Sequence, residues 1–170
     1  MMARLAPPWP IAACLALCAC AGEGGEVVCS SGLTAGTSEG EDMAPGQTCI
    51  ACHAFTNSGG DGMEAPSFAF AGTVYRTAHE PDGCAGGPVG AGSDRAEVEV
   101  ISATGQHHVA PVTAGGNFMV DATAIAFPIT ARVRFQGRTR TMLQAQPTGE
   151  CNLCHTVGGT SGAPGRIMLP

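Results

Sequence analysis

Two short motifs constrain this 170-residue chain more than any other feature of its sequence. Both follow the pattern C-x-x-C-H, and they occupy residues 49–53 and 151–155. On a helical turn, residues i, i+3 and i+4 share one face, so each motif presents two thiols and an imidazole together. This pattern is the attachment sequence for a c-type haem, whose vinyl groups bind the thiols and whose iron binds the histidine.

The two motifs predict two covalently attached haem c groups, each held by two cysteines and one proximal histidine. The residues concerned are Cys49, Cys52, His53, Cys151, Cys154 and His155. Two other interpretations use the same cysteines, namely four thiolates around one zinc ion or a pair of disulfides. Neither of them explains why a histidine directly follows each cysteine pair, and thiolate zinc sites are less expected in an oxidising compartment.

The composition argues against nucleic acid as a partner and shows few aromatic residues for a core. The formal net charge is -6, and the propionates of two haems would make it more negative, so nucleic-acid binding is not expected. Aromatic residues make up only 5% of the chain, which is little for an ordinary hydrophobic core. Haem macrocycles would supply apolar contact area that the side chains lack.

Residues 1–19 have the features of a lipoprotein signal peptide. Arg4 provides a weakly positive start, and residues 11–19 form an apolar stretch that is too short to span a bilayer. The sequence Leu17-Cys18-Ala19-Cys20 resembles a bacterial lipobox with Cys20 as the lipidated residue. Ordinary secretory cleavage one or two residues later is the alternative. We therefore expect an exported lipoprotein of the bacterial cell envelope, facing the periplasm or the cell surface and anchored to the membrane by its lipid.

Two of the nine cysteines remain once the signal peptide, the lipid and the haems are accounted for. Cys14 and Cys18 would be removed with the signal peptide, Cys20 would carry the lipid, and four cysteines belong to the motifs. This leaves Cys29 and Cys84. In an oxidising compartment the pair predicts a disulfide, which would attach the N-terminal segment to a loop of the central domain. Two unrelated thiols are the alternative.

The remainder of the chain divides into a tether, two haem segments and a central domain. Residues 20–44 are rich in Gly, Ser, Thr and Glu and predict a flexible tether. Residues 45–67 and 147–170 surround the motifs and predict short haem c-binding segments with helical or irregular structure. Residues 68–146 form the domain between them.

Apolar residues alternate with polar ones in several short runs of the central domain. The expected strands cover residues 68–75, 97–100, 107–112, 117–120, 129–135 and 138–143. Gln136-Gly137 predicts a hairpin turn, and the alternation predicts that Glu97 and Glu99 face outwards. Short strands without a helical period favour a mainly β fold, an antiparallel β-sandwich.

Four strings in the central domain match a known family of sandwiches. They are Gly72–Tyr75, Ala96–Val100, Gly116–Phe118 and Pro128–Val133. Together they make this stretch similar to the carboxypeptidase regulatory-like, transthyretin-like domain. The resemblance implies a transthyretin/Ig-like β-sandwich.

The flanking sequences extend the resemblance over residues 43–170. Met43–His53 reads Met-x-Pro-Gly-x-x-Cys-x-x-Cys-His, and Cys151–Ile167 combines Cys-Asn-x-Cys-His with Ala-Pro-Gly-Arg-Ile. This arrangement resembles small exported bacterial haem proteins in which such a sandwich lies between the two motifs. Most members are predicted cytochromes, so the resemblance implies a fold and a cofactor more than a pathway.

The sixth ligands of the two irons would come from histidines or methionines outside the motifs. His79 lies in an irregular loop, which suits a ligand, and Met43 lies just before the first motif and could fold back over its haem. We take these two as the candidate distal ligands. The other candidates are His107, His108, Met63, Met119, Met142 and Met168. Met119 and Met142 are more typical of core packing.

These features predict a di-haem c-type cytochrome, a one-electron carrier that exchanges electrons with redox partner proteins and is not an enzyme. The sequence has no recognisable catalytic triad, acid pair or phosphate-binding loop. A haem-based peroxidase or a gas or redox sensor is one alternative, and a surface binding module with structural metal or haem sites is another. The sequence leaves open whether the two haems meet at one end of the sandwich or lie at opposite ends.

Overall fold

The description of the fold rests on a computed structural model. It describes residues 27–35, 39–58, 65–86, 94–122 and 124–170. The expected signal peptide, the lipidation site Cys20 and the candidate ligand Met63 lie outside the described residues. Within the described part of the chain, no helix is long and apolar enough to cross a membrane.

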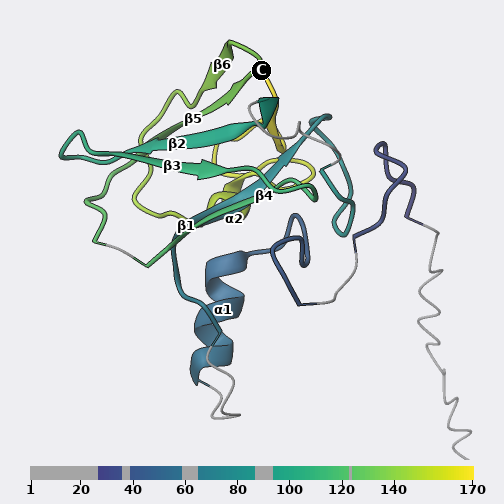
Figure 1. Ribbon diagram of the computed structural model, residues 1–170, viewed down its shortest axis with the longest axis horizontal. Coiled ribbons are helices and arrows are strands. Elements are labelled where there is room, and N and C mark those ends of the chain that lie inside the picture. The colour runs from purple at the N-terminus through teal and green to yellow at the C-terminus, as the bar shows by residue number, and fades with distance from the viewer. Residues whose placement is uncertain (1–26, 36–38, 59–64, 87–93, 123) are drawn as a thin grey trace, which may run out of the picture.

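Seven short strands form two sheets in the described residues (Figure 1). The strands are β1 (Phe68–Tyr75), β2 (Glu97–Ile101), β3 (His107–Pro111), β4 (Asn117–Asp121), β5 (Thr130–Phe135), β6 (Arg138–Thr141) and β7 (Ile167–Met168). The larger sheet has the order β3-β2-β5-β6 and is antiparallel throughout. The smaller sheet has the order β4-β1-β7, in which β4 is antiparallel and β7 parallel to β1. The prediction of a mainly β fold is therefore confirmed.

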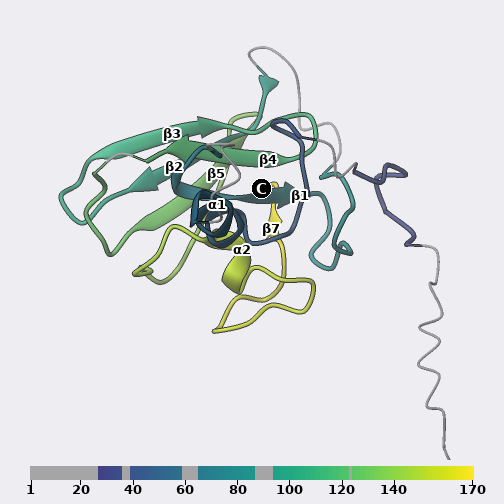
Figure 2. The same cartoon turned by 90° about the horizontal axis from the view of Figure 1, so that it is seen from below.

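Two short helices carry the cysteines of the two motifs. They are α1 (Cys49–Ser58) and α2 (Cys151–Cys154). Both helices pack against β1, and Figure 2, where α1 is seen end-on, shows them next to each other at this strand. The smaller sheet therefore positions both motifs.

The hydrophobic core collects buried residues from both sheets. Phe70 and Val74 of β1 belong to the same cluster as Val98 and Val100 of β2. Strand β1 is buried continuously from Phe70 onwards because the core covers one of its faces and the helices pack on it as well. A strand buried on both faces loses the simple alternation of exposed residues.

The hairpin turn between β5 and β6 lies at the predicted residues. Gln136 and Gly137 both have positive φ angles, of 48° and 73°. Two successive positive φ angles are typical of the tight turns that match the twist of antiparallel strands. Glycine adopts this conformation without a steric cost, so Gly137 is suited to the second position.

The predicted disulfide between Cys29 and Cys84 is present, with an S–S distance of 2.03 Å. Two backbone hydrogen bonds run beside it: Ala35 N–H donates to Gly83 O at 2.7 Å, and Ala85 N–H donates to Leu33 O at 3.0 Å. The disulfide and these bonds hold residues 29–35 of the expected tether against the central domain.

Glu99 lies on the face of the sheet opposite the core, as predicted, but other side chains cover it. It is only 4% exposed, since the side chains of Arg132, Arg134 and His107 close over it on the face opposite the core. His107 Nδ1 lies 2.5 Å from its carboxylate, and Arg132 donates to the other oxygen. The hydrogen bond from Arg132 is the largest cause that lowers the pKa of Glu99 to about 2.

Candidate functional site

The first motif lies in the first turn of α1. Cys49 is half-buried, Cys52 is exposed, and His53 is half-buried against the ring of Phe68, with 4.7 Å between ring centroids. Nδ1 of His53 lies 2.8 Å from the carbonyl oxygen of Pro66. An imidazole that donates from Nδ1 to a carbonyl carries its lone pair on Nε2, the atom that binds a metal.

The second motif repeats this arrangement in a shorter helix. Nδ1 of His155 lies 2.8 Å from the carbonyl oxygen of Gly165. The chain after the motif turns back over α2, and Thr160 donates to the carbonyl oxygens of Cys154 and Leu153 at 2.8 Å and 3.0 Å. Both motif histidines are therefore held by a backbone carbonyl in the tautomer that a metal ligand requires.

Asn152, inside the second motif, joins the two motifs to β1. Its Nδ2 donates to the carbonyl oxygen of Gln47 at 2.8 Å, across 105 positions of sequence. Its Oδ1 accepts the backbone N–H of Thr73 at 3.1 Å. The side chain is buried, with 2% exposure, so each of these hydrogen bonds satisfies a group that has little access to water.

Glu150, directly before the second motif, makes a second connection between the two motifs. Its Oε2 accepts the backbone N–H of Ala51 at 3.0 Å, which is one of the N–H groups in the first turn of α1 that lack a partner within the helix. Gly72 of β1 allows this close packing, because a Cβ there would lie 2.8 Å from the Cβ of Cys151. The two motifs therefore meet at β1.

Arg166 connects the sequences that flank the two motifs. Its guanidinium donates to the carbonyl oxygens of Gly46 and His155, both at 3.4 Å, and forms an ion pair with Asp82. The side chain is buried and stacks over the ring of Tyr75 at 5.0 Å. The Pro-Gly before the first motif and the Gly-Arg after the second motif thus form one packed unit.

A cavity of about 450 Å³ lies beside the second motif. Its walls include Cys151, Cys154 and His155, apolar residues of both sheets such as Val98 and Phe118, and the methionines Met142 and Met168. This volume falls within the range of about 300–1,000 Å³ that is usual for cofactor and ligand pockets. The second motif therefore opens onto a space that a large apolar group could occupy.

The cysteines of the two motifs are free thiols. Cys49, Cys52, Cys151 and Cys154 form no disulfide. Burial, reinforced by the charge of Glu150, raises the pKa of Cys49 to about 11 and that of Cys151 to about 12. Catalytic cysteines have the opposite property, a lowered pKa, so these two thiols do not resemble nucleophiles.

The motif cysteines also do not surround a common metal position. Among the described residues, one group of three potential ligands has its atoms close enough to share an ion, and it consists of Cys29, Glu80 and Cys84. The sulfurs of that group are bonded to each other in the disulfide. The arrangement thus gives no support to a single zinc ion between the two C-x-x-C pairs.

The two candidate distal ligands do not line the cavity. His79 is exposed, and its Nδ1 lies 2.7 Å from the carbonyl oxygen of Val157 in the chain after the second motif. Met43 is half-buried, and its carbonyl oxygen accepts a hydrogen bond from Asn117 at 2.9 Å. Neither side chain lines the cavity, whereas Met142 and Met168 do.

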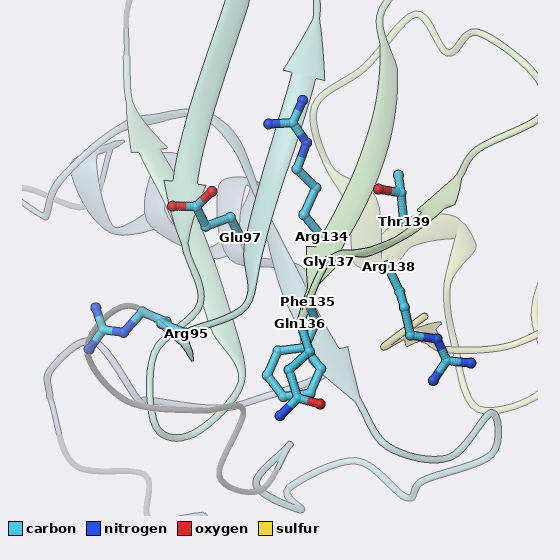
Figure 3. Close-up of a pocket in the computed structure, with 8 residues that line it drawn as sticks. All are labelled: Arg95, Glu97, Arg134, Phe135, Gln136, Gly137, Arg138 and Thr139. Atoms are coloured by element: carbon cyan, nitrogen blue, oxygen red, sulfur yellow. The ribbon is translucent and has the colours of Figure 1, made fainter.

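A second hollow, of about 310 Å³, lies at the β5–β6 turn (Figure 3). Its walls include Arg95, Arg134 and Arg138, and the figure shows their guanidinium groups pointing in different directions. Binding sites for anions bring such groups together around one position. This hollow therefore has charged walls without the convergent geometry of a binding site.

Sequence reasoning missed three residues that build the site, Glu150, Asn152 and Arg166. Asn152 and Arg166 belong to the strings Cys-Asn-x-Cys-His and Ala-Pro-Gly-Arg-Ile, which supplied a resemblance but no role for either side chain. Comparisons with protein-family models, curated proteins and solved structures found no significant match to this chain.

Proposed function

We propose that this protein is a di-haem c-type cytochrome that transfers single electrons at the bacterial cell envelope. The observation that carries the proposal is the shared orientation of the motif histidines. His53 and His155 lie on different elements, yet each has Nδ1 against a backbone carbonyl oxygen at 2.8 Å. Hydrogen bonds of this kind, made by the ring nitrogen that does not bind the metal, orient the histidines that bind metals.

The second haem would occupy the cavity beside α2, where the residues present fit it. Cys151 and Cys154 would hold the thioethers and His155 the iron, while the apolar walls exclude water. Met142 and Met168 line the same cavity, so one of them is our proposed sixth ligand. A haem iron with His and Met ligands supplies a one-electron couple at a raised potential.

Arg140 is placed to bind a propionate of the second haem. It pairs with Val133 across β5 and β6, so its side chain is on the core-facing side of the sheet, and it lines the cavity. Among the described residues, no carboxylate forms an ion pair with Arg140. An arginine can bind a carboxylate with two parallel hydrogen bonds, which suits a propionate.

The finer features of the fold and location are part of the same proposal. The two sheets share one core cluster, which supports a transthyretin/Ig-like β-sandwich with β1 carrying both haem segments. The Cys29–Cys84 disulfide supports an oxidising compartment, in keeping with an exported lipoprotein anchored through Cys20 and exchanging electrons with redox partner proteins.

Expression with a haem maturation system, followed by denaturing electrophoresis, tests the cofactor directly. We expect haem to remain with the polypeptide and pyridine haemochrome spectra to count two haems per chain. Low-spin spectra in both redox states would support an electron carrier. A high-spin band that shifts with carbon monoxide would instead favour a sensor or peroxidase, and a colourless chain would refute the proposal.

The sixth ligand of the second iron can be identified with two matched variants. Met142→Leu and Met168→Leu each remove the thioether and keep an apolar side chain of similar volume. We expect one of them to abolish the iron–methionine charge-transfer band and to lower one reduction potential, because methionine ligation raises the potential. An unchanged spectrum in both variants would show that neither methionine is the ligand.

A further inference from the structure

Glu150 occupies a position that both motifs share. It precedes Cys151 in sequence, and its Oε2 accepts the N–H of Ala51, which lies between the two cysteines of the first motif. Its backbone forms a bridge with Ala71 of β1, and its own N–H donates to Thr148 Oγ1 at 3.1 Å. The carboxylate is therefore held in place by contacts to α1, β1 and the segment before α2.

The carboxylate of Glu150 is buried and only partly hydrogen-bonded. The residue is 7% exposed, and its Oε1 is buried without a hydrogen-bond partner in the part of the chain that the structure describes. No arginine or histidine among the described residues forms an ion pair with it. A buried charge without a partner acts over a longer distance than an exposed one, because water does not screen it.

The carboxylate lies beside both attachment points, because it is adjacent to Cys151 in sequence and accepts the N–H of Ala51 between Cys49 and Cys52. For Cys49 and Cys151 alike, the charge of Glu150 is the second-largest cause of the raised pKa, after burial. By contrast, the nearby cation Arg166 is already paired with Asp82. The electrostatic contribution of Glu150 is thus common to the two sites.

We propose that Glu150 is a shared electrostatic residue that lowers the reduction potentials of both haems. This inference rests on the proposed di-haem function. Ferric haem carries one more positive charge than ferrous haem, so a nearby carboxylate stabilises the oxidised form. One side chain then shifts the two potentials in the same direction.

The test compares Glu150→Gln with Glu97→Gln in the full-length di-haem protein. Glutamine at position 150 removes the charge and retains an oxygen that can accept the N–H of Ala51. Glu97→Gln is the control, because Glu97 is an exposed carboxylate on β2 that lines the hollow at the β5–β6 turn. Potentiometric titration followed by visible absorption gives both midpoint potentials. We expect both to rise in Glu150→Gln and neither to move in Glu97→Gln.

Other outcomes separate this inference from the proposed function. Two haems per chain with unmoved potentials, or with one potential moved, would overturn the shared role of Glu150 and leave the cytochrome intact. A wild-type chain without haem would instead refute the proposed function itself. Glu150→Ala is measured alongside, and loss of haem from both variants would also overturn the inference, because Glu150 would then be required for attachment.

Discussion

The two motifs share a five-residue pattern and differ in their surroundings. The first lies in α1, a helix of ten residues, with Cys52 exposed to solvent. The second lies in α2, a helix of four residues, beside a cavity of about 450 Å³ and under the chain that follows it. In both, the histidine is oriented by a backbone carbonyl. Carbonyl groups outside the motifs, those of Pro66 and Gly165, therefore present the two histidines alike, whereas the surroundings differ in how far they would enclose an attached group.

This difference predicts that the second haem contributes more to stability than the first. A haem in the cavity would fill space between the sheets and α2, whereas a haem on α1 would cover a more exposed surface. Removing a large buried aromatic side chain lowers the free energy of unfolding by about 3–5 kcal/mol, because it leaves an empty cavity. We expect a loss of the same order when the haem cavity is empty. The predictions below test this contrast, starting with the largest effect.

The largest effect is expected when one attachment site is removed at a time. In Cys151→Ala/Cys154→Ala, intact mass should fall by one haem and the free energy of unfolding should fall by about 3–5 kcal/mol, because the cavity loses its content. The matched variant Cys49→Ala/Cys52→Ala should also lose one haem but less stability. Chemical denaturation followed by circular dichroism measures both. An equal or larger loss of stability in the first-motif variant would contradict the contrast between the two motifs.

A smaller effect is expected from Asn152→Ala, which breaks the connection between the motifs. The change leaves the backbone N–H of Thr73 and the carbonyl of Gln47 without their partner, and a buried unsatisfied group costs about 1–3 kcal/mol. We expect destabilisation of about that size, with both haems retained. Leu153→Ala is the control, since Leu153 is 54% exposed and should change stability little. Equal effects of the two variants would argue against the role of Asn152.

Acid should weaken the larger sheet without altering either motif. Because its native pKa is lowered to about 2 from 4.5, Glu99 stabilises the fold above about pH 4.5, and this contribution is lost as pH falls towards 2. Unfolding of the wild type should therefore become easier over that interval, and Glu99→Gln should show a flatter pH dependence. At the pH where unfolding begins, haem absorption should show no change in the ligands of either iron. A wild type and a variant with the same pH profile would contradict this assignment.

The smallest effect is expected at the first motif, where Phe68 contacts His53. Replacement of the ring in Phe68→Leu removes an aromatic contact worth about 0.5–1.5 kcal/mol. We expect a small change in the spectrum and potential of one haem and none in the other, measured by the same optical titration. A response of both haems would show that Phe68 acts beyond the first motif.

The sequence predicted regular strands well because their alternation is local. The predicted strand 68–75 has the bounds of β1, and the Gln136-Gly137 turn joins β5 and β6. Strand β7 was missed because it has two residues and pairs in parallel with the distant β1, which leaves no periodic signal. Long-range pairing of this kind depends on the whole fold.

The site was predicted only as far as its motifs. The six motif residues follow from a fixed spacing, and the Cys29–Cys84 disulfide followed from counting cysteines. The meeting of the motifs depends on Asn152 and Glu150, single polar residues whose partners are about a hundred positions away. Met142 was interpreted as core packing, because a methionine that lines a cavity has the same local pattern as one that fills a core.

Mass spectrometry of proteolytic peptides from the protein matured with haem tests the central claim most directly. We predict one haem on the peptide that contains Cys49 and Cys52, and one on the peptide that contains Cys151 and Cys154. Unmodified thiols in both peptides, in a sample where a control cytochrome from the same cells carries its haem, would contradict the account.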